Sequence, residues 1–250
     1  MVGGASAVLT TRRALALGGV LAAVVLYDAG AGRLPGLSEW WDVAFVALVL
    51  IPATTASLWL ALPAATARGL LPVGLAVGAL AIVLEVAGVG SGFNAAKVVT
   101  YTLLGFVFLE LFQDLSWVVL VATIIPWIDA FSVWRGPTKV VVTQHPGLFD
   151  RISIAFRLPG EEGSANLGPP DILFFALFLA TAHRFGLRTG WTWLTTSALL
   201  GVTLALTSAF DLNGLPALPA ISLGFLLPNA DLLWKRWRDR RRELSDARAG

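Results

Sequence analysis

One apolar run constrains this chain more than any other feature. Residues 116–134 read SWVVLVATIIPWIDAFSVW and are apolar over nearly their whole length. A run of this length and composition is typical of a membrane-spanning helix. It nevertheless contains one carboxylate, that of Asp129. An ionisable side chain inside a membrane helix is costly, so its presence indicates a functional site.

The composition of the whole chain also indicates a membrane protein. Of the 250 residues, 56% are hydrophobic and 14% are charged, whereas a soluble domain carries about 25% charged residues. The chain has no cysteine, which excludes disulfides and thiolate chemistry, and only two histidines, so we expect no metal site. The sequence therefore predicts an all-α polytopic membrane protein that needs no cofactor.

Eight apolar segments are candidates for membrane spans. They are residues 14–30, 40–62, 69–88, 95–112, 116–134, 170–185, 189–210 and 215–234. We interpret residues 1–250 as one membrane domain, with N-terminal helices in 1–115, a second half in 116–234 and a basic tail in 235–250. Arg12-Arg13 before the first run also occurs in signal peptides, but the spans that follow favour a retained helix.

Basic residues predict the orientation in the membrane. Residues 235–250 contain seven Lys or Arg against three Asp or Glu. Lys and Arg are enriched at the cytoplasmic ends of spans, so an even number of spans places both termini in the cytoplasm. We interpret the tail as an anchor on the lipid bilayer and expect no nucleic-acid partner. The loop 135–168 then lies outside, although Arg135, Lys139, Arg151 and Arg157 in it favour the opposite orientation.

The loop between the fifth and sixth predicted spans has strand periodicity. Residues 139–143 are mostly β-branched, and residues 152–158 alternate apolar with small or polar side chains. Pro146-Gly147 between them is typical of a turn. These patterns predict a small β-hairpin in the loop.

Counting spans brings three distant segments to one depth in the membrane. Asp171 lies at the loop end of the sixth predicted span, and consecutive spans are antiparallel, so Asp171 and Asp129 lie at similar depth. The eighth span begins on the same side, with Pro216-Ala217-Leu218-Pro219. Ordinary explanations remain open: a buried aspartate can bind a neighbouring helix, and an acid after proline is common at a helix start.

These segments resemble the motifs of the presenilin and signal-peptide-peptidase family. Asp129, Gly168-Pro169-Pro170-Asp171 and Pro216-Ala217-Leu218-Pro219 are the residues that carry the resemblance, which covers about 116–229. The chain differs from the family where Ile128 precedes the first aspartate and Pro170 precedes the second. The resemblance implies that Asp129 and Asp171 are the catalytic pair. It also implies that the remaining motif residues shape the active site and bind substrate.

The resemblance implies an intramembrane aspartyl protease of the prokaryotic presenilin-like kind, located in the plasma membrane. Its substrates would be transmembrane peptides, such as remnant signal peptides, or single-span proteins. We expect the strand 152–158 to pair with an unwound substrate by strand addition. Two alternatives remain open. One is an inactive relative that binds transmembrane helices, and the other is a proton-coupled transporter with Asp129 as a relay, which an internal repeat would favour.

Overall fold

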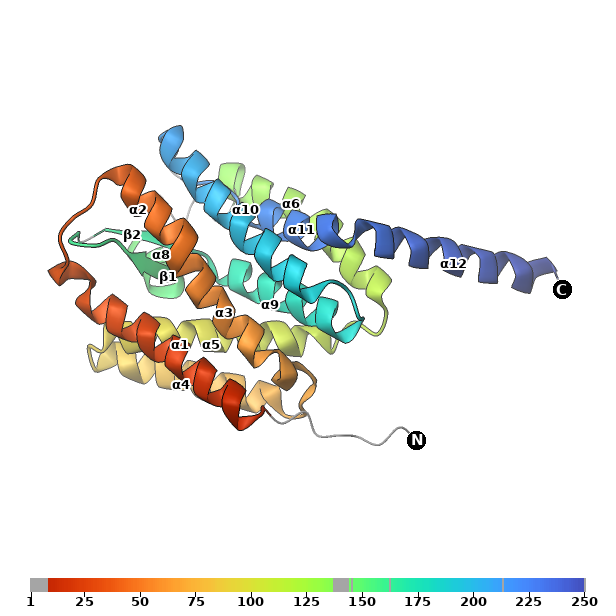
Figure 1. The fold of residues 1–250 in the computed structure, drawn as a ribbon, viewed down its shortest axis with the longest axis horizontal. Coiled ribbons are helices and arrows are strands. Elements are labelled where there is room, and N and C mark those ends of the chain that lie inside the picture. The colour runs from red at the N-terminus through yellow and green to blue at the C-terminus, as the bar shows by residue number, and fades with distance from the viewer. Residues whose placement is uncertain (1–8, 137–143, 145, 162, 213, 250) are drawn as a thin grey trace.

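The computed structural model describes residues 9–136, 144, 146–161, 163–212 and 214–249. The chain forms a helical bundle with a small β-sheet at one end (Figure 1). The helices are α1 Thr11–Gly30, η1 Ala31–Arg33, α2 Glu39–Phe45, η2 Val46–Leu50, α3 Ile51–Ala61, η3 Leu62–Thr66, α4 Leu70–Val86, α5 Gly90–Leu109, α6 Leu115–Arg135, α8 Pro146–Ile152, α9 Pro169–Arg184, α10 Thr189–Ala209, α11 Leu218–Leu226, η4 Leu227–Asn229 and α12 Ala230–Ala249.

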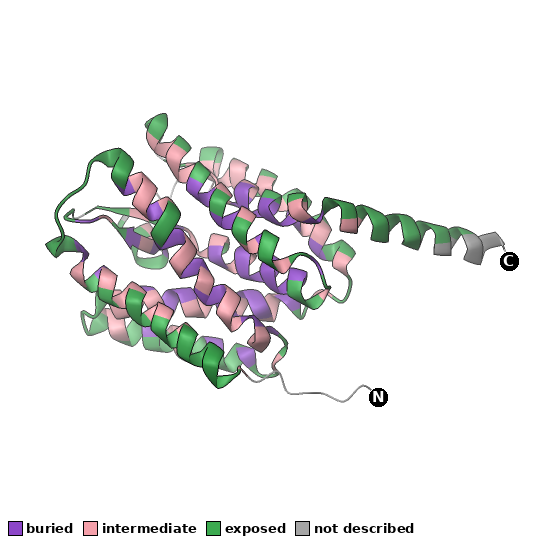
Figure 2. Ribbon diagram, in the orientation of Figure 1, coloured by how far each residue is buried: buried purple, intermediate pink, exposed green. Residues whose placement is uncertain are grey.

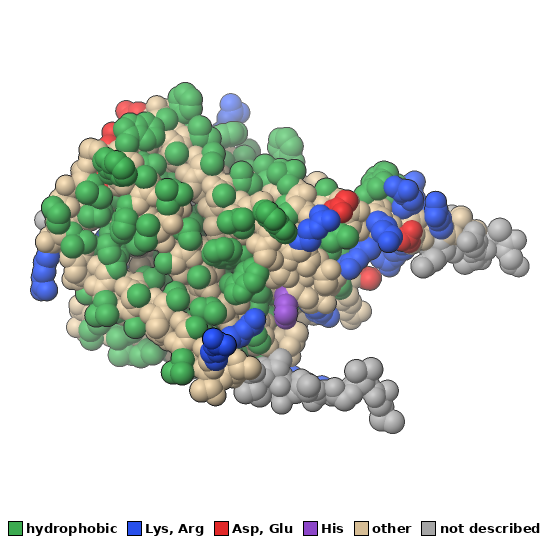
Figure 3. All heavy atoms as spheres, viewed as in Figure 1, with side chains coloured by type: hydrophobic (Ala, Val, Ile, Leu, Met, Phe, Trp, Pro, Cys, Tyr) green, Lys and Arg blue, Asp and Glu red, His purple; other side chains and the backbone are tan. Residues whose placement is uncertain are grey.

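Five helical segments of the described chain are long and apolar enough to cross a membrane. They are Thr11–Arg33, Glu39–Thr66, Gly90–Leu109, Leu115–Arg135 and Thr189–Ala209. Hydrophobic side chains spread over the outer surface of the bundle (Figure 3), as expected of a surface in contact with lipid. The structure therefore has five full-length candidate spans rather than the eight expected.

The other three predicted spans correspond to shorter helices. The third and sixth are α4 and α9, and the eighth is divided into α11, a single 3₁₀ turn and α12. Pro228 lies in that turn and has no N–H to continue a regular helix. The predicted basic tail is helical, and it projects from the bundle as the greater part of α12 (Figure 1).

The predicted hairpin exists, but with a different partner strand and turn. β1 Ile154–Arg157 pairs antiparallel with β2 Ser164–Leu167, and Ala155 lies opposite Asn166. The prediction of a turn at Pro146-Gly147 is wrong, because these residues open helix α8, where proline is well tolerated in the first turn. The predicted strand at 139–143 lies outside the described residues.

Helix α9 is the centre of the core. Its residues 175–182 are all buried (Figure 2), and it packs against α5, α10 and α11. Close approach of α5 depends on Gly105, because a Cβ there would collide with the carbonyl oxygen of Leu173 and lie 2.7 Å from the Cβ of Ala176. Helices in membranes commonly approach through small residues of this kind. This central position fixes the residues at the start of α9.

Candidate functional site

Asp129 lies on helix α6, at the edge of the bundle. Its neighbours Trp127, Ile128 and Phe131 are 77%, 56% and 63% exposed and form the outward face of the helix. Asp129 is half-buried and faces α11. Because Ile128 points outward, the difference from the family motif at this position does not alter the inner side of α6.

The start of helix α11 binds the Asp129 carboxylate. The backbone N–H of Leu218 donates a hydrogen bond to Oδ2 of Asp129 over 3.0 Å. Leu218 is the first residue of α11, so its N–H has no acceptor within the helix. The partial positive charge of a helix N-terminus also favours a carboxylate there. Pro216, Ala217 and Pro219 frame this donor.

Asp171 lies at the start of helix α9 and binds the backbone that precedes it. The N–H of Gly168 donates to Oδ2 of Asp171 over 2.8 Å, and the N–H of Asp171 donates to the Gly168 carbonyl over 3.1 Å. Pro169 and Pro170 occupy the first helical positions, where an N–H has no acceptor within the helix. A proline before Asp171 is therefore compatible with this helix start, although it differs from the family motif.

The two carboxylates, far apart in sequence, lie on helices α6 and α9, which contact each other. Asp129 and Asp171 lie near enough for their charges to repel each other. Helix α11 packs against both α6 and α9 and so joins the two sides of the site. Oδ2 of each aspartate accepts a backbone N–H, and no hydrogen bond reaches either Oδ1 from the described part of the chain.

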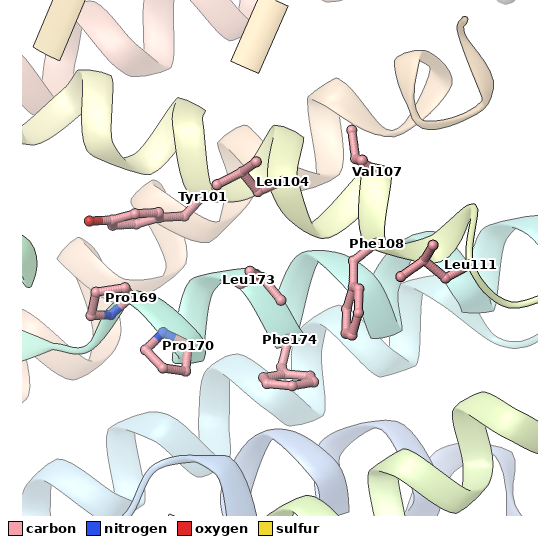
Figure 4. Close-up of a pocket in the computed structure, with 9 residues that line it drawn as sticks. All are labelled: Tyr101, Leu104, Val107, Phe108, Leu111, Pro169, Pro170, Leu173 and Phe174. Carbon is pink, nitrogen blue, oxygen red and sulfur yellow. The ribbon is translucent and has the colours of Figure 1, made fainter. Parts of the chain in front are cut away.

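An apolar groove begins beside this site. It has a volume of about 630 Å³ and lies between α5 and α9 (Figure 4). Its walls are formed by Tyr101, Leu104, Val107, Phe108, Leu111, Pro169, Pro170, Leu173 and Phe174. Pro169 and Pro170, which directly precede Asp171 in the sequence, form one end of the groove, so this end lies at the start of α9. Sequence reasoning identified the two prolines but missed the α5 wall, since that helix showed only the pattern of an ordinary span.

The described residues show no group of three or more His, Cys, Asp or Glu side chains that could hold a metal ion. The acids at the site are two, Asp129 and Asp171. Two neighbouring carboxylates can share a proton and act together as acid and base. No protein-family model matches this chain, and no curated protein matches it.

Proposed function

We propose that the protein is an intramembrane aspartyl protease with Asp129 and Asp171 as its catalytic pair. The observation that carries the proposal is that Asp129 and Asp171, 42 residues apart in the sequence, lie on the contacting helices α6 and α9, near enough for their charges to repel, with the N–H of Leu218 bound to Asp129. The resemblance of the three motifs to the presenilin and signal-peptide-peptidase family supports the same reaction.

The mechanism follows from the proximity of two acids. Two neighbouring carboxylates do not both ionise readily, so they share one proton. The ionised group removes a proton from water, which attacks the scissile carbonyl carbon. The protonated group donates a hydrogen bond to the carbonyl oxygen and then protonates the leaving amine. Because the pair titrates as a unit, the two roles belong to the pair rather than to one residue.

The groove between α5 and α9 suits an apolar substrate segment. It is lined by aromatic, aliphatic and proline side chains, and it ends at the residues that precede Asp171. An apolar transmembrane segment lying in the groove would bring its chain to the start of α9, the helix that carries Asp171. We therefore propose transmembrane peptides and single-span proteins as the substrates.

Strand addition of a substrate would take place at β2 rather than β1. Asn94 binds both the N–H and the carbonyl of Ala155, and β2 covers the other edge of β1. Since Ala155 directs its backbone groups away from β2, the opposite residue Asn166 directs its own away from β1. Asn166 is exposed and lies five residues before Asp171. Because Asn94 binds the outer edge of β1, we propose β2 as the pairing edge in place of the strand 152–158 expected from the sequence.

The test is cleavage of a single-span reporter by purified protein in liposomes. We expect Asp129→Asn and Asp171→Asn each to lower the cleavage rate roughly 10²- to 10⁴-fold, the usual contribution of acid–base catalysis. Asp211→Asn is a matched control, because Asp211 is exposed, with φ of 49°, a conformation that asparagine tolerates. Wild-type cleavage by Asp171→Asn would overturn the proposal.

A second candidate is a non-catalytic membrane protein that binds transmembrane helices. It is favoured by the hydrogen bond between Asp171 and Gly168, a capping role that requires no chemistry. This candidate predicts that wild type and Asp171→Asn bind the reporter equally well, measured by cross-linking, and that neither cleaves it. The same preparation therefore distinguishes the two functions.

We further propose eight membrane passes, with the hairpin on the outer side of a prokaryotic plasma membrane. The direction of the chain alternates from α1 through α2–α3, α4, α5, α6, α9 and α10 to α11 (Figure 1). Arg151 and Arg157, which favour a cytoplasmic hairpin, form ion pairs with Glu85 at 3.3 Å and Asp28 at 3.4 Å. The α12 end carries the larger number of exposed Lys and Arg side chains, so we propose that it is the cytoplasmic end.

A further inference from the structure

A stripe of three polar side chains runs along the inner face of helix α5. The stripe consists of Asn94, Lys97 and Tyr101, spaced three and four residues apart, so they share one face of the helix. Asn94 and Lys97 are only 7% and 6% exposed. Buried amide and ammonium groups in a largely apolar helix are costly unless they bind partners. Their hydrogen-bond partners therefore indicate the role of the stripe.

All three side chains bind the backbone of residues 151–155, which form the end of α8 and the start of β1. Nδ2 of Asn94 donates to the Ala155 carbonyl over 2.8 Å, and the Ala155 N–H donates to Oδ1 over 3.0 Å. Nζ of Lys97 donates to the carbonyls of Arg151, over 3.0 Å, and Ser153. The hydroxyl of Tyr101 donates to the Ile152 carbonyl over 2.8 Å. The stripe thus holds backbone atoms rather than particular side chains.

These contacts lie well below the end of the bundle, which explains why side chains of helix α5 bind these backbone groups. Lys97 lies seven residues into α5, about 10 Å along its axis. Irregular backbone at such a depth in a membrane protein must be paired with protein groups, because lipid offers none. The last carbonyls of α8 and the outer edge of β1 have no partners within their own elements. The stripe satisfies these groups and so holds the segment in one position.

From Asn94 a short covalent and hydrogen-bonded path leads to the carboxylates. Ala155 lies opposite Asn166 in the hairpin, and Gly168, which binds Asp171, follows two residues later. Tyr101 also lines the apolar groove, so the stripe contacts both the groove and the hairpin. A shift of the hairpin along α5 would therefore shift β2 relative to Asp171.

We propose that Asn94, Lys97 and Tyr101 are positioning residues that determine which peptide bond of the substrate is cut. The inference rests on the proposed protease function. A substrate strand paired with β2 takes its register from β2, and a slip of one residue presents a different bond to the carboxylates. The stripe fixes the position of β2 and therefore the site of cleavage.

The first measurement is hydrogen–deuterium exchange of the purified protein in detergent. In Tyr101→Phe, Asn94→Leu and Lys97→Met we expect the amides of residues 153–157 to exchange roughly fivefold faster for each lost hydrogen bond. The amides of α10 and α11 should exchange as in wild type. Thr100→Val is the control, because the Thr100 hydroxyl donates to the Ala96 carbonyl within α5. Unchanged exchange at 153–157 in all three variants would overturn the anchoring role.

The second measurement maps the cleavage products of a single-span reporter by mass spectrometry. We expect one main cut in wild type and Thr100→Val, and cuts spread over neighbouring bonds in the three stripe variants. A variant that was merely misfolded would lower all products in the same proportion. Faster exchange without a change in the product distribution would refute the inference alone. A wild type that cuts no reporter would refute the protease function, and the cleavage-site role with it.

Discussion

At the scale of single residues, two backbone N–H groups decide how the acids are held. The N–H of Leu218 holds Asp129, and the N–H of Gly168 holds Asp171. Both donors lie at the starts of helices, where N–H groups lack partners in the helix. The same feature that starts α9 and α11 therefore also orients the two carboxylates. Substitutions at these helix starts should therefore alter the orientation of the carboxylates without replacing either aspartate.

Gly168→Ala tests this orientation. A Cβ at Gly168 would lie 3.2 Å from Oδ2 of Asp171, so the carboxylate must move by a few tenths of an ångström. Because misplacement of about 1 Å can cost a hundredfold in rate, we expect reporter cleavage to fall roughly tenfold. Gly18→Ala is the control, since no atom lies within 4 Å of a Cβ there. Equal cleavage rates for the two variants would contradict this view of Gly168.

The sequence identified Asp129 and Asp171 because acids are rare in its apolar segments. It did not identify Leu218 as the donor to Asp129, since any of the motif's backbone groups could have faced the acid. It also missed Asn94 and Lys97. The predicted fourth span began after Asn94, and a hydropathy pattern does not distinguish a polar residue facing protein from one facing lipid.

At the scale of elements, the site depends on the contact between α5 and α9. These helices form the walls of the groove, and Gly105 allows their backbones to approach. The contact also places the polar stripe of α5 beside the hairpin that precedes α9. Loss of this close packing should therefore affect the stability of the bundle and the shape of the groove together.

Gly105→Ala should destabilise the bundle, while Gly74→Ala should not. A methyl group at Gly105 overlaps backbone and side-chain atoms of α9, and overpacking of this kind costs about 1–3 kcal/mol. At Gly74 the nearest atom, Cβ of Leu103, lies 3.4 Å away, an ordinary contact. Thermal unfolding of both variants in detergent measures the difference. A melting temperature for Gly105→Ala equal to that of Gly74→Ala would show that α9 can move away without cost.

The hairpin shows why elements were only partly predictable. The alternation in 152–158 correctly predicted β1, because apolar Ile154 and Phe156 face the core. Its partner Ser164-Ala165-Asn166-Leu167 contains residues with little preference for strands, and it becomes a strand by pairing with β1. The division of the last predicted span was missed for a similar reason, since its apolar pattern continues through Pro228.

At the scale of the whole molecule, charge separates the two ends of the bundle. The end from which α12 projects carries most of the exposed basic side chains (Figure 3). These are Arg12, Arg13, Arg68, Arg184, Arg188, Lys235, Arg236, Arg238, Arg240, Arg241 and Arg242. The hairpin end has fewer exposed basic residues, namely Arg33, Arg135, Arg151 and Arg157. This asymmetry predicts the orientation of the protein in the membrane.

Single cysteines provide the test, because the chain has none of its own. Glu161→Cys places a thiol at the hairpin turn, while Arg68→Cys and Arg242→Cys place thiols at the opposite end, all at exposed positions. With a membrane-impermeant maleimide on intact cells, we expect labelling of Glu161→Cys alone. The other two should react only after permeabilisation.

Each pair of labelling sites tests a separate part of the topology. Three of the proposed passes, α4, α5 and α6, lie between Arg68 and Glu161, so eight passes require these positions to be on opposite sides of the membrane. Three more proposed passes, α9, α10 and α11, lie between Glu161 and Arg242, so eight passes require Arg68 and Arg242 to be on the same side. Different sides for Arg68 and Arg242 would refute eight passes, because α4, α9 or α11 would then fail to cross.

Labelling of Arg68→Cys and Arg242→Cys from outside, with Glu161→Cys protected, would retain the eight passes but reverse the orientation of the protein in the membrane. The carboxylates would then open toward the cytoplasm, and their substrates would have to be cut from that side.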